Sequence, residues 1–590
     1  MKKILLFVAA IMSCVSVMGQ WNPDPAVNMQ VWPNESFYST DMQETPDGCV
    51  WLAVYHPFHV DDENGTRLYG GCTVALQLYD SLGYARFEQP IEVSNYASRT
   101  YVSCGDFFYV DRDGNAIVAI YDWRQGEENA EGLSVYKISP EGEFLWGEDG
   151  ITLDGENLYD EIAFITMSQM TDGSYVFAWA HTTYPANYYH RTIELQRVSA
   201  EGEMLWNPED VRMFDENISY SDSYLVDGGS NTVILLYSKG SAQDIYARKI
   251  DFEGASVWSE DVCIYNGGWG SVPIWTVMQV HPVAGGGLMV SWNDDRWYEQ
   301  IEHPYMVYVK TNGELGFTID NGQLLSLSQW RTLNVKSLYD EESDCFYAMW
   351  NECSSSQAWN SVVAQRISKE GELLWGDYGI ELKPMELTNY GYFSVQSALN
   401  DEIAFFYMRS YTNNYTNVEA FVTTVNVNDT IARREREFTK GSRISCKAGL
   451  KSTPMIDGKY WVTKWTDNGS HESDEELVDR LLMQRVNYDF TLGAYNADDA
   501  VEAVRNENNT FVALATMVEN EAMFATNFAV ATQATLAIYD VNGVLVATPF
   551  DGVLAAGKQY IEWNANVPAG IYIATLTTAQ GVETVKLLVK

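Results

Sequence analysis

Short runs in which apolar and polar residues alternate, separated by turns that contain Gly, extend over most of the chain. Four examples are VALQLY (74–79), SVYKI (134–138), IELQRV (193–198) and VVAQRI (362–367). Alternation with a period of two over about four to eight residues is typical of a strand with one buried face. The pattern therefore predicts an all-β fold built from many short strands.

One phrase recurs after these runs and marks an internal repeat. It reads x-x-Glu-Gly-x-x-x-Trp, and its copies occupy residues 139–146, 199–206, 251–258 and 368–375, with looser copies starting at Asp80, Thr311 and Asn426. A second phrase, a turn followed by a strand that often ends in Trp, comes before it, as in DGNAIVAIYDW (113–123). Units that start near residues 47, 113, 172, 227, 285, 343, 400 and 457 give eight repeats of about 58 residues.

Each repeat has room for four strands, which is the number in a propeller blade. The repeats therefore predict an eight-bladed β-propeller over residues 20–490, and seven blades remain possible if one of the looser units is misassigned. The eighth unit has no fourth strand after LLMQRVN (481–487), whereas residues 21–29 resemble residues 206–213. We expect this N-terminal strand to complete the last blade, which would remove an exposed sheet edge.

The two ends of the chain differ from the repeats. Residues 1–19 have a charged start, Lys2-Lys3, and an apolar run that is too short to span a bilayer, which predicts a secretory signal peptide cut before Gln20. Residues 491–507 are small and acidic and predict a linker. Residues 508–590 form a further β-rich domain, in which Asn542-Gly543 predicts a hairpin.

The C-terminal domain carries three motifs in a fixed order: Tyr-Asp-Val-Asn-Gly at 539–543, Val-Pro-Ala-Gly-Ile-Tyr at 567–572 and Lys-Leu-Leu-Val-Lys at 586–590. This order resembles the type A C-terminal sorting domain of the type IX secretion system of Bacteroidetes, although Val567 stands where Leu is commoner. The residues that carry the resemblance are Tyr539, Asp540, Asn542, Gly543, Pro568, Ala569, Gly570, Tyr572, Lys586 and Lys590.

The resemblance implies a small β-sandwich, a partnership with the type IX secretion machinery, export through the periplasm, and a final place outside the cell or on the outer-membrane surface. An ordinary immunoglobulin-like module is the alternative. The repeats themselves resemble those of large exported bacterial proteins of unassigned role, which implies a fold but no activity.

The net charge and the apolar runs limit the kinds of partner and membrane attachment that we expect. The formal net charge of −44 would repel nucleic acid and anionic membranes, so we expect no nucleic-acid partner. Because the chain has no second long apolar run, we also expect no transmembrane segment.

Seven cysteines remain after removal of the signal peptide, without a paired motif. Cys345 and Cys353 could form a disulfide, and buried free thiols are the other interpretation.

In a propeller, the loops between second and third strands share one face, and here they are long and variable, which favours binding on that face. Trp, Arg and carboxylates at the start of these loops suit sugar recognition, and packing between blades is the competing interpretation for the recurring Trp. The candidate ligand-binding residues are Trp123, Arg124, Trp179, His181, Trp292, Asp294, Arg296, Trp350, Glu352, Trp465 and Asp467.

The sequence contains none of the usual catalytic or nucleotide-binding motifs, and it predicts neither a metal nor a cofactor. We therefore expect a non-catalytic surface protein that binds a glycan or a protein. The alternatives are a propeller enzyme, a glycoside hydrolase or lyase that acts on polysaccharide, and a structural component of the cell surface.

Overall fold

A computed structural model gives the fold. It describes residues 21–590 except 34, 62–66, 97–106, 125–131, 156–160, 184–189, 242, 268–277, 297–300, 318–320, 411–416, 429–431, 441–445, 468–479, 494–508, 514–516, 519–520, 529–530, 542, 556 and 579–580. The expected signal peptide and nearly all of the expected linker lie outside the described residues. The chain divides into two compact units, one of residues 24–488 and one that contains residues 489–590 together with the N-terminal 23 residues.

The described residues of 24–488 form eight antiparallel sheets, numbered here in chain order. Sheets 1 to 4 contain β2 (Ser39–Glu44), β3 (Val50–Asp61), β4 (Arg67–Tyr79) and β5 (Ile91–Glu92); β6 (Phe108–Val110), β7 (Ala116–Asp122), β8 (Gly132–Ile138) and β9 (Ile151–Asp154); β10 (Glu161–Gln169), β11 (Tyr175–Thr183) and β12 (His190–Val198); and β13 (Tyr220–Gly229), β14 (Thr232–Lys239), β15 (Asp244–Asp251) and β16 (Val262–Tyr265).

Sheets 5 to 8 contain β17 (Gln279–Val283), β18 (Gly287–Asp294), β19 (His303–Val309) and β20 (Gln323–Leu324); β21 (Arg331–Asp340), β22 (Cys345–Cys353), β23 (Trp359–Ile367) and β24 (Ile380–Leu387); β25 (Asn389–Ser397), β26 (Glu402–Ser410), β27 (Val418–Asn426) and β28 (Ala432–Thr439); and β29 (Lys447–Ser452), β30 (Tyr460–Asp467), β31 (Arg480–Asn487) and β1 (Met29–Gln30). In sheet 3 the fourth strand is reduced to a single bridge between Ile193 and Met213, beside the short helix α1 (Pro208–Val211).

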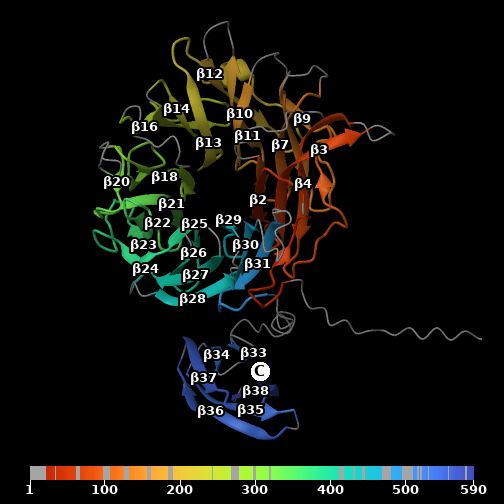
Figure 1. Cartoon of the computed structure of the whole chain (residues 1–590), viewed down its shortest axis with the longest axis vertical. Coiled ribbons are helices and arrows are strands. Elements are labelled where there is room, and N and C mark those ends of the chain that lie inside the picture. The colour runs from red at the N-terminus through yellow and green to blue at the C-terminus, as the bar shows by residue number, and fades with distance from the viewer. Residues whose placement is uncertain are drawn as a thin grey trace, which may run out of the picture. The chain divides into compact units, whose positions relative to one another are not determined.

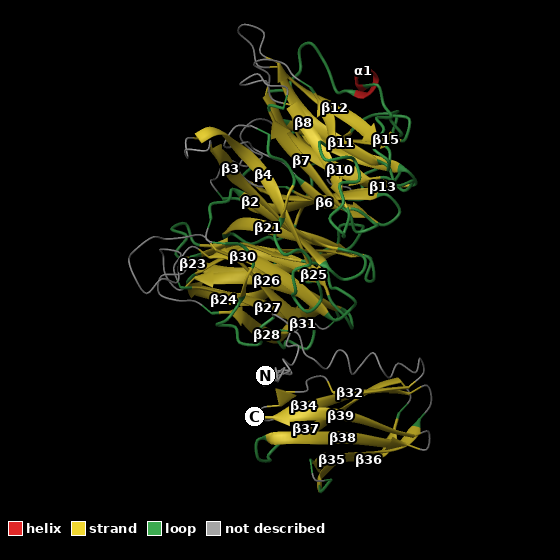
Figure 2. Cartoon of the chain, turned by 90° about the vertical axis from the view of Figure 1, so that its right-hand side faces the viewer, coloured by secondary structure: helices red, strands yellow, loops and turns green. Residues whose placement is uncertain are grey.

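The sheets follow one another around a common axis. Figure 1 shows the first strands, such as β2, β21, β25 and β29, nearest the centre, and the fourth strands β16, β20, β24 and β28 at the rim. Figure 2 shows β2, β21, β24, β25 and β28 from the side, with loops at both ends of the sheets. Hydrophobic clusters fill the space between neighbours; for example, Met289 of sheet 5 and Phe346 of sheet 6 belong to one cluster. The fold is therefore all-β and propeller-like, as the alternation predicted.

The recurring Trp phrase has a structural explanation. Its Gly residues, among them Gly142, Gly202, Gly254 and Gly371, all have positive φ, which residues with a Cβ rarely adopt. Four copies of the phrase place a Trp whose indole N–H donates to a backbone carbonyl of the next sheet: Trp146 to Ala200 (3.1 Å), Trp206 to Phe252 (2.9 Å), Trp258 to Thr311 (3.0 Å) and Trp375 to Val427 (3.4 Å). The phrase thus makes a tight turn and fastens each sheet to its successor.

The ring is closed between the last sheet and the first. The N-terminal strand β1 pairs with β31, with Met29 opposite Met483, which confirms the strand expected from residues 27–29. Lys464 of sheet 8 donates to the hydroxyl (2.7 Å) and the carbonyl oxygen (3.0 Å) of Thr40 in sheet 1. Lys451 forms an ion pair with Asp41 across the same boundary. The termini of the repeat region therefore protect each other's sheet edges.

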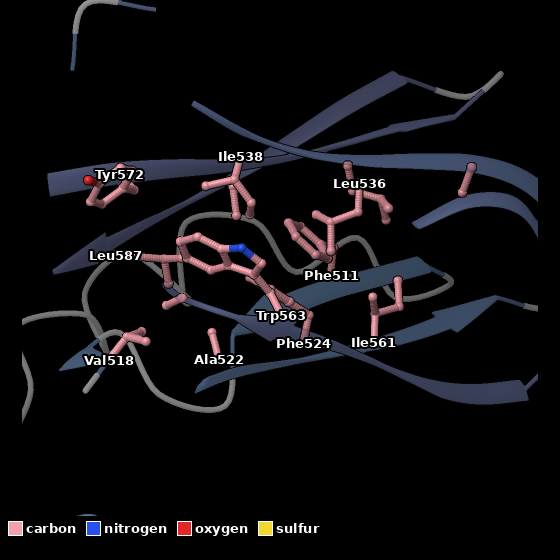
Figure 3. Close-up of a cluster of buried hydrophobic side chains, with 14 of the residues drawn as sticks. Phe511, Val518, Ala522, Phe524, Leu536, Ile538, Ile561, Trp563, Tyr572 and Leu587 are labelled. Atoms are coloured by element: carbon pink, nitrogen blue, oxygen red, sulfur yellow. The ribbon is translucent and has the colours of Figure 1, made fainter. Parts of the chain in front are cut away.

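Residues after 508 form two sheets. One consists of β32 (Asn509–Ala513), β34 (Glu521–Phe528) and β37 (Gly557–Asn564); the other of β33 (Met517–Val518), β39 (Gly581–Val589), β38 (Gly570–Thr578), β35 (Thr532–Asp540) and β36 (Leu545–Leu554). Side chains from both sheets, including Phe524, Leu536 and Trp563, pack in one hydrophobic cluster (Figure 3). Burying each such side chain contributes roughly 1.5–3 kcal/mol, so this unit has a core of its own.

The structure bears on two further features, the disulfide between Cys345 and Cys353 and the presence of membrane-spanning helices. Cys345 and Cys353 are free and buried, so the proposed disulfide between them is wrong. They begin and end the same strand, β22, and an extended strand of that length holds its ends about 25 Å apart, far beyond the Cα separation that a disulfide allows. Within the described residues, the one helix is far too short to cross a bilayer.

Candidate functional site

The tryptophans predicted to bind ligand are mostly buried between sheets. Trp179, Trp292, Trp350 and Trp465 are almost fully buried within the second strands β11, β18, β22 and β30, and Trp123, just after β7, is partly buried. Trp292, for example, packs edge-on against Tyr265 of sheet 4 and stacks on Tyr305 of its own sheet. A sugar cannot reach a ring that lies between two sheets, so this burial favours the packing interpretation for these tryptophans.

A carboxylate recurs near the end of the second strands, and in sheets 2, 5 and 8 its charge is neutralised. Asp122 binds Arg124 in a bidentate pair (2.9 and 2.8 Å), and Asp294 binds Arg296 in the same way (2.9 and 2.6 Å) while accepting from the indole N–H of Trp292 (2.7 Å). Asp467 lies 3.7 Å from the ammonium of Lys447. In these sheets the predicted site residues are buried ion pairs.

Sheet 3 uses a different arrangement for the same purpose. The carboxylate of Asp154 accepts from the indole N–H of Trp179 (2.8 Å) and lies 3.0 Å from Nδ1 of His181. One carboxylate thereby holds both predicted residues of this sheet. These contacts hold β11 against β9, the last strand of sheet 2.

Glu352 of sheet 6 is the exception. It occupies the position of Asp294, two residues after a buried Trp, and its side chain is almost fully buried. Among the described residues no Lys, Arg or His pairs with it. Burial raises the pKa of Glu352, and the negative charge of nearby Glu381 raises this pKa further, while hydrogen bonds with Ser328 and Trp350 act in the opposite direction. Sheet 6 therefore contains a buried carboxyl group that lacks the cation its counterparts have.

Glu352 lies in a pocket between sheet 6 and the segment that connects sheet 5 to it. The pocket has a volume of about 420 Å³, within the range of small-molecule sites. Its lining is Leu327, Ser328, Gln329, Trp330, Glu352, Val363, Tyr378, Gly379 and Glu381. The segment 325–330, which connects the two sheets, forms one wall: the N–H of Leu327 donates to the carbonyl of Asp377 (2.8 Å), and this bond holds the segment beside Tyr378. Sheet 6 forms the opposite wall.

Aromatic rings line this pocket and remain accessible. Trp330 is 48% exposed and Tyr378 is 63% exposed, in contrast to the buried Trp at the strand ends. Strand register places another exposed ring on the same face, because Ser361 lies opposite Glu352 and Trp359 is two residues before it. Exposed flat rings beside carboxylates and the Gln329 amide are the groups that recognise sugars, through stacking and directional hydrogen bonds.

Of the predicted site residues, the pocket contains one, Glu352. Sequence reasoning missed Trp330, Tyr378, Trp359 and Glu381. A signal was present, because Trp330 and Trp359 fall outside both recurring Trp positions of the repeat, so packing between sheets does not explain them. Tyr378 stands where the first full repeat has Asp149.

The predicted sorting motifs form two turns in the C-terminal unit. Asp540 closes the first turn: its backbone N–H donates to the carbonyl of Val544 (2.9 Å) and its carboxylate accepts from the N–H of Val544 (2.9 Å), with Gly543 at φ 80°. Asn542 lies outside the described residues. In the second turn, the hydroxyl of Tyr572 donates to the carbonyl of Pro568 (2.8 Å). Lys586 and Lys590 are exposed, on β39 and directly after it.

Within the part of the chain that the structure describes, no group of three or more His, Cys, Asp or Glu side chains is arranged to hold a metal ion. The pocket on sheet 6 offers two carboxyl groups, an amide, a hydroxyl and two rings. These groups can bind a neutral polyhydroxylated ligand, or transfer a proton between an acid and a base.

No known family profile matches the chain, and no curated protein matches its sequence. Solved structures give distant similarities. An α-L-arabinofuranosidase from Lactobacillus brevis is 10% identical, with 47% of this chain and 94% of that chain covered and a TM-score of 0.27. A protein of unknown function from Dyadobacter fermentans is 8% identical, with coverage of 65% and 96% and a TM-score of 0.28.

A third similarity is to an α-L-arabinanase from Penicillium chrysogenum in complex with arabinobiose. It is 10% identical, with 58% of this chain and 97% of that chain covered and a TM-score of 0.28. At these identities and TM-scores, neither the activity nor the substrate of any of these proteins transfers to this chain.

Proposed function

We propose that this chain is an exported eight-bladed β-propeller that binds a neutral glycan in the pocket between sheet 6 and the segment 325–330. The observation that carries the proposal is Glu352, a buried carboxyl group without a cation, in a pocket lined by the exposed rings of Trp330 and Tyr378. In sheets 2, 3, 5 and 8 an Arg, His or Lys side chain pairs with the carboxylate beside the second strand. In sheet 6 a ligand with hydroxyl donors takes that place.

The chemistry of the pocket selects the class of glycan. Carboxylates accept hydrogen bonds, and sugar hydroxyls supply the donors. Two carboxyl groups and no lining Lys or Arg would repel a uronate or a sulfated sugar. Trp330 and Tyr378 offer ring faces to the apolar face of a pyranose or furanose, and Trp359 on the same sheet face extends the surface beyond one sugar unit.

The test is isothermal titration calorimetry of the full chain against soluble neutral polysaccharides and their carboxylated counterparts. We expect a neutral polysaccharide to bind, and Trp330→Ala and Tyr378→Ala each to weaken it about 10-fold, since an aromatic contact contributes about 0.5–1.5 kcal/mol. Phe252→Ala, which removes an exposed ring from a turn after β15, is the matched control. Equal affinity in all four proteins would contradict the proposal.

A glycoside hydrolase is the second candidate, and one observation favours it. The pKa of Glu352 is raised by burial and by the charge of Glu381, so the pocket can hold one protonated and one ionised carboxyl group. In that case Glu352→Gln would abolish release of reducing sugar and keep polysaccharide binding. A protein that binds but releases no sugar with Glu352 intact is a binding module.

The proposed function includes delivery by type IX secretion, with residues 508–590 as a sandwich-type sorting domain at the cell surface. The motif order of 539–543, 567–572 and 586–590 supports this proposal. In a bacterium with a type IX system, the full chain should reach the surface. A chain that ends at residue 507 should accumulate in the periplasm, and equal surface labelling of both would argue against sorting.

A further inference from the structure

The first strands of the sheets share an unusual backbone feature near the ring axis. Five of them contain a β-bulge just after the strand begins, and the bulged residue has a left-handed conformation in each: Phe164 (φ 55°), Asp222 (51°), Asn334 (59°), Tyr392 (52°) and Gly449 (64°). Residues with a Cβ rarely adopt positive φ, and for bulky residues such as Phe and Tyr it is exceptional. Such strain recurs at binding sites, and bulges serve to re-aim side chains.

Three of these bulged residues are solvent-exposed, although their strands lie nearest the centre of the ring (Figure 1). They are Asn334 of sheet 6, Tyr392 of sheet 7 and Gly449 of sheet 8, which are consecutive sheets. The amide nitrogen of Asn334 donates to Oδ1 of Asn351 (3.1 Å), so the bulges present the amide oxygen of Asn334, the Tyr392 ring and the backbone at Gly449 on one arc around the axis.

The same bulges place positive charges beside this arc. Lys336 and Lys451 each lie two residues after the bulged residue of their strand, in sheets 6 and 8. Lys464, on the neighbouring strand of sheet 8, is buried and bonds Thr40. The strands that carry Lys336 and Lys451, β21 and β29, pack on either side of β25. Burial, followed by the charge of Lys451, lowers the pKa of Lys336.

Neither Asp41 nor Glu44 neutralises the charge of Lys336. Asp41 is taken by Lys451. Glu44 lies near Asp41 and Lys451, and burial raises its pKa, which favours its neutral form. His281 of β17 also lies near Lys336, and burial, followed by the charge of Lys336, lowers its pKa to about 4, so it is neutral at pH 7. Among the described residues, Lys336 has no hydrogen bond and no ion pair, in a chain whose net charge is −44.

We propose that the axial end of sheets 6 to 8 is a second binding site, which takes a carboxylated sugar with its carboxylate on Lys336. Asn334 supplies its amide oxygen as an acceptor and Tyr392 supplies a ring to the sugar, and Lys451 adds positive charge. This site prefers an anionic ligand, whereas the Glu352 pocket prefers a neutral one, so the two sites together would engage a heteropolysaccharide that carries both kinds of sugar.

The experiment compares trigalacturonate with a neutral trigalactoside by calorimetry on the full chain. We expect trigalacturonate to bind, Lys336→Gln to weaken it about 10- to 100-fold, as for a hydrogen bond to a charged group, and Lys336→Arg to retain most of the affinity. Lys310→Gln is the matched control, because it removes the same charge from an exposed turn between β19 and β20.

Two further variants distinguish the axial sugar site from a simple anion site and from the Glu352 pocket. Tyr392→Ala should weaken trigalacturonate and leave the weak binding of acetate unchanged, because only a sugar uses the ring. Trp330→Ala should leave trigalacturonate binding unchanged, so the axial site and the Glu352 pocket can fail independently. Unchanged affinity in Lys336→Gln, with the thermal midpoint of the wild type, would overturn the axial site, as would a preference for the neutral trimer.

Discussion

Sheets 5 and 6 each place a buried carboxyl group near the end of the second strand, but among the residues that the structure describes only the carboxyl group of sheet 5 has a cationic partner. At the end of β18, Asp294 accepts from Trp292 and from the guanidinium of Arg296, whose plane also lies 3.4 Å from the centre of the Tyr305 ring. At the end of β22, Glu352 faces Glu381 and a pocket. A repeat protein thus keeps one scaffold and can change a structural ion pair into a binding group by omitting the cation.

The largest expected effect is a loss of stability when the ion pair of sheet 5 is removed. Asp294→Ala leaves a largely buried guanidinium and the indole N–H of Trp292 without their acceptor, so we expect a loss of about 3 kcal/mol of unfolding free energy. Chemical denaturation measures this loss. Asp295→Ala, at the next residue, should change the stability by less than about 1 kcal/mol; similar losses in the two variants would show that the Asp294 pair is not special.

An Arg introduced beside Glu352 tests whether the missing cation explains the difference between the two sheets. Ser354 follows Glu352 as Arg296 follows Asp294, so Ser354→Arg should form the missing pair. We expect neutral-glycan affinity to fall about 10-fold, because the guanidinium takes the acceptor that the ligand uses, and the stability to rise by about 0.5–1 kcal/mol. Ser354→Gln provides a neutral side chain of similar reach, and if it weakens binding equally, the charge is not responsible.

The smallest effect concerns Glu352 alone. Its pKa in the folded chain is raised above the ordinary 4.5, so the folded state holds a proton that the unfolded state has already lost, and wild-type stability falls as pH rises through this interval. Glu352→Gln does not titrate. Relative to wild type, the variant should therefore gain a few tenths to about 1 kcal/mol between pH 4 and pH 7, measured by denaturation at both pH values. A constant difference would mean that Glu352 is not perturbed.

Much of the fold was predictable because it depends on local patterns. Alternation defines strands, Gly permits the left-handed turn, and the spacing of the phrases counts the sheets. Even the pairing of β1 with β31 followed from the resemblance between residues 21–29 and 206–213. The sequence could not, however, decide whether the Trp in each second strand packs between sheets or stacks on a sugar, because both roles are compatible with that position.

The sequence by itself determined the repeat, its turns, the closure of the ring and the presence of a carboxylate near the ends of several second strands. Only the tertiary structure decided which carboxylates are neutralised and which rings remain exposed. The surroundings of Glu352 come from segments that lie apart in the chain. Trp330 belongs to the connection between sheets 5 and 6, and Glu381 belongs to the outer strand β24. Charge compensation and burial are properties of that spatial neighbourhood, so no local pattern encodes them.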